Sequence, residues 1–354
     1  MDEDLLQHHI ENLRKFSFNC STVYEPGLKC KNKLDETRAL FANLFKVDKK
    51  DIIFTSGGTE SNNMAINCTR DLYKRGGVIW YSTTSHPSLL NPIMDMDDSW
   101  KKIPLPLHSN GNIDYEACLN LEKPNIIATE WVNSEVGLIR DIDSLTKFIE
   151  ETKLNASLVV DGVQGLGKIA LPNLKNITAF TFSGHKCGAP VGVGGIILNN
   201  AVRYSPMLLG GGQEKNKRSG TESTPSIITM WEAINKCEKS RQVNNTLNWH
   251  LDSPKKIRKE DAEYSPYIYL IDTSPVEGEV LLHHLEEKSI YIGLGSACSA
   301  SKKKISNTHK SLGLSEKKSR CTIRISFSPD IEQGTLNKAQ DSISEVWQSL
   351  KKFF

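Results

Sequence analysis

The chain has 354 residues, with 44 basic and 42 acidic side chains and a formal net charge of +2. This length can bury a substantial core and predicts two domains. The balanced charge gives no case for binding nucleic acid or an anionic membrane surface. No apolar run approaches transmembrane length, and the acidic start MDEDLLQHH lacks the order of a signal peptide. We therefore expect a cytoplasmic protein without a membrane partner.

The eight cysteines are scattered, and no two of them form a C-x-x-C pair. This pattern is typical of neither a zinc site nor a disulfide framework. Two pairs of adjacent histidines do not share a helix face and are interpreted as surface residues. We therefore expect no metal site.

Apolar spacing predicts an amphipathic helix over residues 1–14 and another helix over 34–45. Apolar, β-prone runs predict strands at 52–55, 78–81, 126–128, 158–160, 179–182 and 195–198. Helical segments between several of these strands, such as 145–152, imply right-handed crossovers. The expected fold class is α/β, with a mostly parallel sheet flanked by helices.

The composition changes after about residue 234, where Lys, Asn and Glu become frequent. Shorter strands at 267–270 and 322–326 then alternate with helices. We expect a large cofactor-binding domain over residues 20–235 and a smaller α+β domain over 236–354, joined by the N-terminal helix 1–19.

Two of the predicted strands end abruptly in polar, reactive side chains. Asp161 and Gln164 follow the strand 158–160, and Ser183, His185 and Lys186 follow the strand 179–182. Ligands of open α/β sheets bind outside the carboxyl ends of the strands, so these groups are expected to converge. An acid, an amide, a hydroxyl, an imidazole and an amine at one edge indicate a cofactor site built around a lysine. Pyridoxal phosphate fits that set.

The segment FTSGGTESNN, residues 54–63, predicts a strand, a glycine turn and the start of a helix. Unpaired backbone N–H groups and the helix dipole favour an anion at such a turn. Gly57 and Gly58 allow close approach of the backbone, and Thr59 adds a hydroxyl donor. An ordinary βα turn is the alternative interpretation.

The segment GGGQEKNKRSGT, residues 210–221, combines three glycines with lysines, an arginine and a terminal Ser-Gly-Thr. It could bring Thr221 and a cation to a phosphate. The alternative is a flexible, solvated surface loop.

The segment GSACSAS, residues 295–301, places Cys298 among small residues with three lysines close behind. Small neighbours predict an accessible loop, and nearby ammonium groups favour the thiolate. The alternative is an inert thiol, as most single cysteines are, and nothing local to Cys298 overturns that alternative.

Two other ligand or enzyme classes find less support. Ser183 to Lys186 fits the S-x-x-K motif of serine acyl-enzymes, but the serine closes a strand rather than opening a buried helix, and no S-D-N follows. The glycine-rich stretch 188–195 does not have the spacing of a dinucleotide fingerprint.

The order of the motifs resembles that of a cysteine desulfurase: FTSGGTESNN, SHPSLLN, VNSEVG, DGVQGLGK, SGHK, GGGQEKNKRSGT, GSACSAS and TIRISFS. That family belongs to the class V aminotransferase group of fold-type I pyridoxal phosphate enzymes. The resemblance runs from about Asn19 to Phe327, and the region around Cys298 is similar to the branch with the longer catalytic loop.

The resemblance implies a role for each matched residue. Lys186 would form the Schiff base with the cofactor, and Asp161 would face the pyridine nitrogen. Gln164 would reach the ring hydroxyl. His86 would stack on the ring and carry the proton of the substrate thiol. The phosphate would be bound by Gly58, Thr59, Ser183 and His185, and Thr221 would reach the cofactor of a second subunit, which implies a homodimer. Cys298 would carry the persulfide, and Arg324 would bind the substrate carboxylate as a fork.

The chain departs from the family pattern in three places. Ser134 stands where the family usually has an asparagine; it can still donate one hydrogen bond to the cofactor or substrate. The family's opening strand and its L-D-x-x-A-T-T segment have no match, and the stretch between Thr221 and Cys298 is compressed.

The resemblance implies a cysteine desulfurase that converts L-cysteine to L-alanine and leaves sulfur on Cys298. Its sulfur acceptor would be a protein such as an iron–sulfur scaffold or a tRNA-thiolation protein. Two alternatives are a selenocysteine lyase and a non-catalytic relative that serves as a scaffold, the latter motivated by Ser134 and the unmatched segment. The joint presence of the cofactor and substrate residues favours the enzyme.

Overall fold

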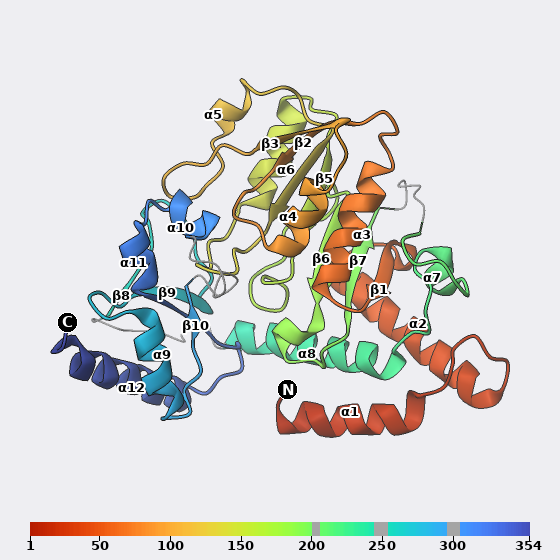
Figure 1. Cartoon of the computed structure of the whole chain (residues 1–354). Helices are drawn as coiled ribbons and strands as arrows, with labels where there is room; N and C mark the ends of the chain where they lie inside the picture. The colour runs from red at the N-terminus through yellow and green to blue at the C-terminus, as the bar shows by residue number, and fades with distance from the viewer. Residues whose placement is uncertain (200–205, 244–253, 296–304) are drawn as a thin grey trace. The chain divides into compact units, whose positions relative to one another are not determined.

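The computed structural model describes residues 1–199, 206–243, 254–295 and 305–354 (Figure 1). Contacts between residues divide the chain into two compact units. The first unit comprises Met1–Pro104, Asn120–Trp131 and Asp141–Lys239, and the second comprises Leu105–Leu119, Val132–Arg140 and Ser240–Phe354. The last large division thus falls at Lys239, near the expected boundary, but two short excursions of the chain, 105–119 and 132–140, belong to the second unit.

The first unit contains a seven-stranded sheet. In spatial order its strands are β1 (Ile52–Thr55), β7 (Gly194–Leu198), β6 (Ala179–Ser183), β5 (Ser157–Asp161), β4 (Ile126–Glu130), β2 (Gly77–Tyr81) and β3 (Trp100–Pro104). The pairs from β6 to β3 are parallel, whereas β7 runs antiparallel to both of its neighbours. The mostly parallel sheet predicted from the sequence is confirmed.

Two strands of this sheet differ from a simple parallel arrangement predicted from the sequence: β7 in its direction, and β3 because it was not predicted. Only ten residues, 184–193, connect β6 to β7, which is too short for a parallel crossover, so β7 returns antiparallel. The edge strand β3 was not predicted, because Lys101, Lys102 and Pro104 hide its pattern. Lysine and proline are suited to an edge, where one side of the strand has no partner.

The first unit also contains helices, several of which connect strands of the sheet. They are α1 (Glu3–Phe16), α2 (Glu25–Phe45), α3 (Gly58–Arg70), α4 (Pro87–Met94), α6 (Ile142–Glu151), α7 (Gln213–Asn216) and α8 (Thr224–Val243). α3 packs on β1, β5, β6 and β7, where Met64, Ala65 and Ile66 join the buried core. α1 lies along α8, and the side chains of His9 and Asn12 contact the Thr229 hydroxyl at 3.1 and 3.3 Å (Figure 1).

The second unit contains a four-stranded antiparallel sheet with helices. The strand order is β10 (Gly293–Leu294), β11 (Thr322–Ser326), β9 (Ile268–Asp272) and β8 (Lys255–Lys256). The helices are α5 (Tyr115–Cys118), α9 (Gly278–Glu286), α10 (Asn307–Ser311), α11 (Glu316–Arg320) and α12 (Gln333–Lys351). α9 and α12 pack together over a core that includes Leu281, Ile323 and Trp347. The predicted smaller α+β fold is what this unit shows.

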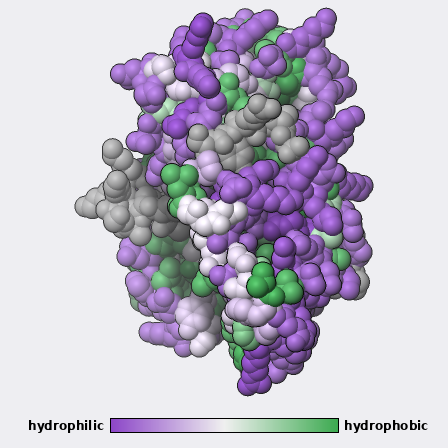
Figure 2. Space-filling model, turned by 90° about the vertical axis from the view of Figure 1, so that its right-hand side faces the viewer, coloured by the Kyte–Doolittle hydropathy of each residue, from purple (hydrophilic) through white to green (hydrophobic). Residues whose placement is uncertain are grey.

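The surface in Figure 2 is mainly hydrophilic, with apolar side chains gathered in a few places. Elsewhere in the chain's described parts, Val23, Val191 and Leu209 are among the most exposed large apolar side chains, at 90%, 82% and 84%. No helix in the described ranges has the length and apolar character that crossing a membrane requires.

Candidate active site

The carboxyl ends of β5 and β6 carry the predicted polar residues of the first unit. Asp161 is the last residue of β5, and Ser183 is the last residue of the neighbouring parallel strand β6. The chain then forms a short 3-10 turn, Gly184–Cys187, which holds His185 and Lys186 at the surface. Parallel strands end at the same edge of a sheet, so these residues are brought together as expected.

Asp161 is buried, with 6% of its surface exposed. Its Oδ1 accepts a hydrogen bond from the Val163 backbone N–H at 3.0 Å, and its Oδ2 accepts one from the Asn62 amide at 2.8 Å. Burial raises the pKa of Asp161 above its usual value even though these two donors favour the carboxylate. The remaining lone pairs of the carboxylate can accept a further N–H, such as that of a pyridinium ring.

His86 lies at the N-cap of α4, and its Nδ1 receives the Ser88 backbone N–H at 3.1 Å. Partial withdrawal from water lowers the pKa of His86, the Asp161 carboxylate raises it, and the Lys186 ammonium lowers it further. The net direction is downward, so the neutral ring predominates at pH 7. These effects also show that His86, Asp161 and Lys186 share one electrostatic neighbourhood.

A glycine turn at the start of α3 lies against the end of β6. Gly57 is the N-cap residue, with φ of 147° and no side chain to cap the helix amides. A Cβ atom at Gly58 would lie 2.8 Å from a Val163 methyl group and 3.5 Å from Cβ of Ser183, so only glycine fits there. The Ser183 hydroxyl is 2.8 Å from Nδ1 of His185. Uncapped amides, a hydroxyl and an imidazole form a donor set that suits a phosphate.

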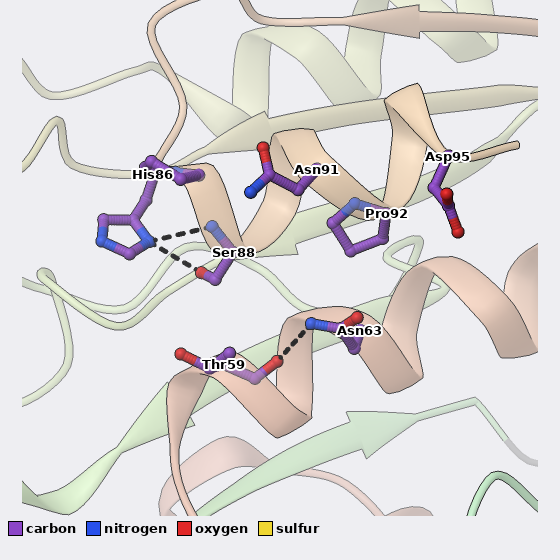
Figure 3. A pocket seen from close by; sticks show the side chains of 8 residues that line it. Thr59, Asn63, His86, Ser88, Asn91, Pro92 and Asp95 are labelled. Atoms are coloured by element: carbon purple, nitrogen blue, oxygen red, sulfur yellow. Dashed lines mark hydrogen bonds between the residues drawn. The ribbon is translucent and has the colours of Figure 1, made fainter. Parts of the chain in front are cut away.

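A cavity of about 570 Å³ opens beside this edge, between α3 and α4 (Figure 3). Thr59 and Asn63 line it from α3, whereas His86, Ser88 and Asn91 line it from α4. His86 and Thr59, two residues expected to contact the cofactor, are therefore both in the lining of this cavity.

One buried and one partly buried ion pair hold the segment 210–221, although several of its residues are exposed. Arg218 binds Glu60, in the first turn of α3, through two hydrogen bonds of 2.7 and 3.1 Å. Arg38 binds Glu214 through two bonds of 2.8 and 2.6 Å. Thr221, at the end of the segment, is exposed.

Ser134 and Arg324 belong to the second unit and lie together there. The Arg324 guanidinium donates to the Ser134 carbonyl oxygen at 3.2 Å. Asn133 is buried and accepts the backbone N–H groups of Glu135 and Val136, so its side chain caps its own turn. Cys298 lies outside the described residues.

The sequence interpretation missed Asn62, Ser88 and Glu130. Asn62 links Asp161 to Ser88, and Glu130 is the residue paired with Asp161 on β4. Glu130 is buried and accepts the hydroxyl protons of Thr84, at 2.6 Å, and Ser85. Ending the β4 strand at 128 rather than 130 hid Glu130. Had the strand been extended, this acid would have appeared at the same edge as Asp161.

The residues at this edge fit pyridoxal phosphate. A lysine amine, a buried carboxylate with free acceptor capacity and an anion cradle lie within one unit. Within the described residues the amide of Gln164 has no hydrogen-bond partner, which leaves it available to a ligand.

A family model and similar curated proteins point to the same family. The family model "Aminotransferase class-V" matches residues 2–337. Cysteine desulfurase IscS of Buchnera aphidicola subsp. Baizongia pistaciae is 33% identical over 334 residues, covering 88% of this chain and 81% of that protein. Cysteine desulfurase IscS of Rickettsia prowazekii is 32% identical over 330 residues, covering 88% and 79%.

Solved structures share the fold. A NifS-like protein from Rickettsia africae superposes with a TM-score of 0.84 at 24% identity, covering 98% of this chain and 96% of that one. A second NifS-like protein gives a TM-score of 0.86 at 22% identity, covering 99% and 97%. The chain therefore belongs to the class-V aminotransferase family and, within it, to the pyridoxal phosphate-dependent cysteine desulfurases.

Proposed function

We propose that this desulfurase takes sulfur from L-cysteine at the carboxyl edge of the seven-stranded sheet and passes it to Cys298. The observation that carries the proposal is that Asp161 and Ser183 end neighbouring parallel strands, and that Lys186 lies in the turn directly after Ser183. A solved protein of the same fold, SspA in complex with cysteine, has a TM-score of 0.77 at 23% identity over 93% of this chain and 96% of that one. That complex supports cysteine as the substrate class.

The cofactor, when bound, supplies an electron sink for the substrate carbon from which a proton is removed. Lys186 would bond the cofactor, and Asp161 would accept the ring N–H. Gln164 would bind the ring hydroxyl. The phosphate would be bound by Gly58, Thr59, Ser183 and His185.

The remaining steps use side chains of this chain. Lys186 would remove the α-proton, while Arg324 binds the substrate carboxylate beside Ser134. The Cys298 thiolate would attack the substrate sulfur, so that an S–S bond forms as the C–S bond breaks. The electron pair of the broken bond stays with the substrate β-carbon, which takes up a proton. The α-carbon regains the proton that Lys186 removed, and the product leaves as alanine.

The assembly and the partner are also part of the proposal. Thr221 would complete the cofactor site of a second subunit in a homodimer. The sulfur acceptor would be a protein such as an iron–sulfur scaffold or a tRNA-thiolation protein. We propose a cytoplasmic location, with no direct role for nucleic acid.

Absorption spectroscopy of the purified protein tests the proposal. A band near the visible edge should shift on addition of L-cysteine, and alanine should form.

Lys186→Ala should remove the band, whereas Lys175→Ala, at an exposed lysine, should keep it. Cys298→Ala should keep the band and lose turnover. A band that survives in Lys186→Ala, or alanine formation at a near wild-type rate in Cys298→Ala, would contradict the assignment. A colourless protein that does not take up pyridoxal phosphate would favour the scaffold.

A further inference from the structure

Asn62 is a buried amide with three hydrogen bonds, at 1% exposure. Its Nδ2 donates to Asp161 Oδ2 at 2.8 Å and to Ser88 Oγ at 2.8 Å. Its Oδ1 accepts the Thr181 hydroxyl at 2.6 Å. The amide therefore bridges the carboxylate at the end of β5 and the first turn of α4.

The orientation of this amide is forced by chemistry. Turning it over would place Oδ1 against the oxygen of Asp161, so that two acceptors would face each other within a buried site. The NH₂ group must therefore face Asp161 and Ser88. Both of its protons are used in these two bonds.

The direction of the next bond follows. Since the Ser88 hydroxyl oxygen accepts a proton from Asn62, its own proton is free to point at Nδ1 of His86, 2.8 Å away. The Ser88 backbone N–H, which can only donate, points at the same nitrogen from 3.1 Å. Two donors therefore converge on Nδ1, which leaves no room for a proton there. In the neutral ring the proton must sit on Nε2, which points away from Ser88 (Figure 3).

We propose that Asn62 and Ser88 are positioning residues that hold His86 as the tautomer with its proton on Nε2. This inference rests on the proposed function, because it concerns what His86 offers to substrate. An Nε2–H group gives a hydrogen bond and cannot accept the proton of a neutral thiol. His86 would thus stabilise a substrate thiolate instead of carrying the thiol proton, the role that the family resemblance implies, and another base must take that proton.

The charged groups that face His86 do not oppose this tautomer. Asp161 and Lys186 act on the ring with opposite signs. The Asp161 carboxylate can only accept a proton, so it favours a proton on Nε2, and in the holoenzyme the Lys186 amine would be bonded to the cofactor rather than act as an ammonium donor to Nε2. The bonds at Nδ1 therefore decide which nitrogen carries the proton.

Nitrogen NMR of the ¹⁵N-histidine-labelled holoenzyme tests the proposal without using activity. At neutral pH, Nδ1 of His86 should have the shift of an unprotonated ring nitrogen and Nε2 that of a protonated one. His86→Gln assigns the signals by their loss. A proton on Nδ1 in the wild-type protein would overturn the proposal, and this measurement needs no variant of Asn62 or Ser88.

Ser88→Ala tests the positioning role. Losing one donor to Nδ1 should raise the pKa of His86 by about half a unit to one unit, the amount that one neutral hydrogen bond supplies. Ser88→Thr, which keeps the hydroxyl, should restore the wild-type pKa. Asn91→Ala, on the same helix and the same cavity, should leave it unchanged. An unchanged pKa in Ser88→Ala would overturn the role of Ser88. Because the cofactor band and alanine formation are separate measurements, failure here is distinguishable from failure of the proposed function.

Discussion

Both units bury ionisable side chains, but they treat them differently. In the first unit, Arg38 and Glu214 are 7% exposed and form a two-bond ion pair. In the second unit, His309 is fully buried; its Nδ1 lies 2.6 Å from the Ser319 hydroxyl, and its Nε2 has no hydrogen-bond partner among the described residues. The Glu135 carboxylate lies 3.9 Å from Nε2, beyond hydrogen-bond distance.

The difference shows what a buried charge needs in order to persist. Arg38 also donates to the Ile52 carbonyl, and Glu214 also accepts the Phe54 N–H, so the remaining groups of the pair are satisfied. This set fixes a turn in which Glu214, Lys215 and Asn216 all have left-handed φ values of 48°, 59° and 64°. Such residues disfavour that region by about 1–2 kcal/mol each. His309, without a second partner, loses its charge instead, because burial lowers its pKa to about 4.

Removing one member of the ion pair is expected to have the largest effect on stability. Glu214→Ala leaves the buried Arg38 guanidinium unpaired, and the free energy of unfolding should fall by about 3–5 kcal/mol. Chemical denaturation measures this loss. Glu25→Ala, which removes an exposed ion pair with Lys29 on the same helix as Arg38, is the control and should change little.

A double variant distinguishes the unpaired charge from the strained turn. Arg38→Met combined with Glu214→Leu removes both charges and should recover part of the loss seen in Glu214→Ala. If the double variant is no more stable than Glu214→Ala, the ion pair stabilises the fold only by fixing the turn at residues 214–216. That result would contradict the conclusion that the unpaired charge causes the loss.

The buried histidine should make the second unit sensitive to acid. The pKa of His309 is about 4 in the folded chain and near 6.5 when unfolded, so the unfolded chain binds the proton more tightly. Stability should therefore fall as the pH drops below about 6.5 and level off below 4, by about 3 kcal/mol in total. The measurement is the free energy of unfolding at pH 7 and pH 4.

A variant without the imidazole isolates this contribution. His309→Leu should reduce the difference between pH 7 and pH 4 by about 3 kcal/mol, whereas His284→Gln, at an exposed histidine, should keep the wild-type difference. Equal acid sensitivity in His309→Leu and the wild type would mean that other groups govern the loss.

The sequence predicted the parts of the fold and site that follow from local pattern. The strands 52–55 and 322–326 coincide with β1 and β11, because apolar β-prone runs mark both ends. Asp161, Ser183 and Lys186 were placed together because parallel strands end at one edge. This part of the site was predicted from the rule that ligands bind at the carboxyl ends of parallel strands, and no contact between side chains was needed.

The parts that sequence reasoning missed depend on distant contacts. Asn62 and Asp161 are 99 positions apart, and Arg38 and Glu214 are 176 positions apart. No spacing rule joins such residues. The segments 105–119 and 132–140 belong to the second unit for the same reason: only long-range packing reveals where a short excursion of the chain lies.

Glu130 is a third buried ionisable group, and two of its hydrogen bonds come from hydroxyl groups. Its carboxylate accepts the hydroxyl protons of Thr84 and Ser85, and its charge adds to the effect of burial in raising the pKa of Asp161. Glu130→Gln removes this charge and one of the two acceptors. The loss of stability should be about 1–2 kcal/mol, the cost of weakening the hydrogen bonds that two buried hydroxyl groups make to a charged acceptor.

The same substitution should move the titration of the neighbouring acid. Without the like charge on β4, the pKa of Asp161 should fall, and carbon NMR of labelled aspartate, assigned with Asp161→Asn, can follow it. Thr84→Val is the matched comparison, because it removes one donor to Glu130 and keeps the charge, so the pKa of Asp161 should not fall. An unchanged Asp161 titration in Glu130→Gln would mean that Glu130 holds its proton in the folded chain. Glu130 would then resemble His309, as a buried group that gives up its charge in the folded chain.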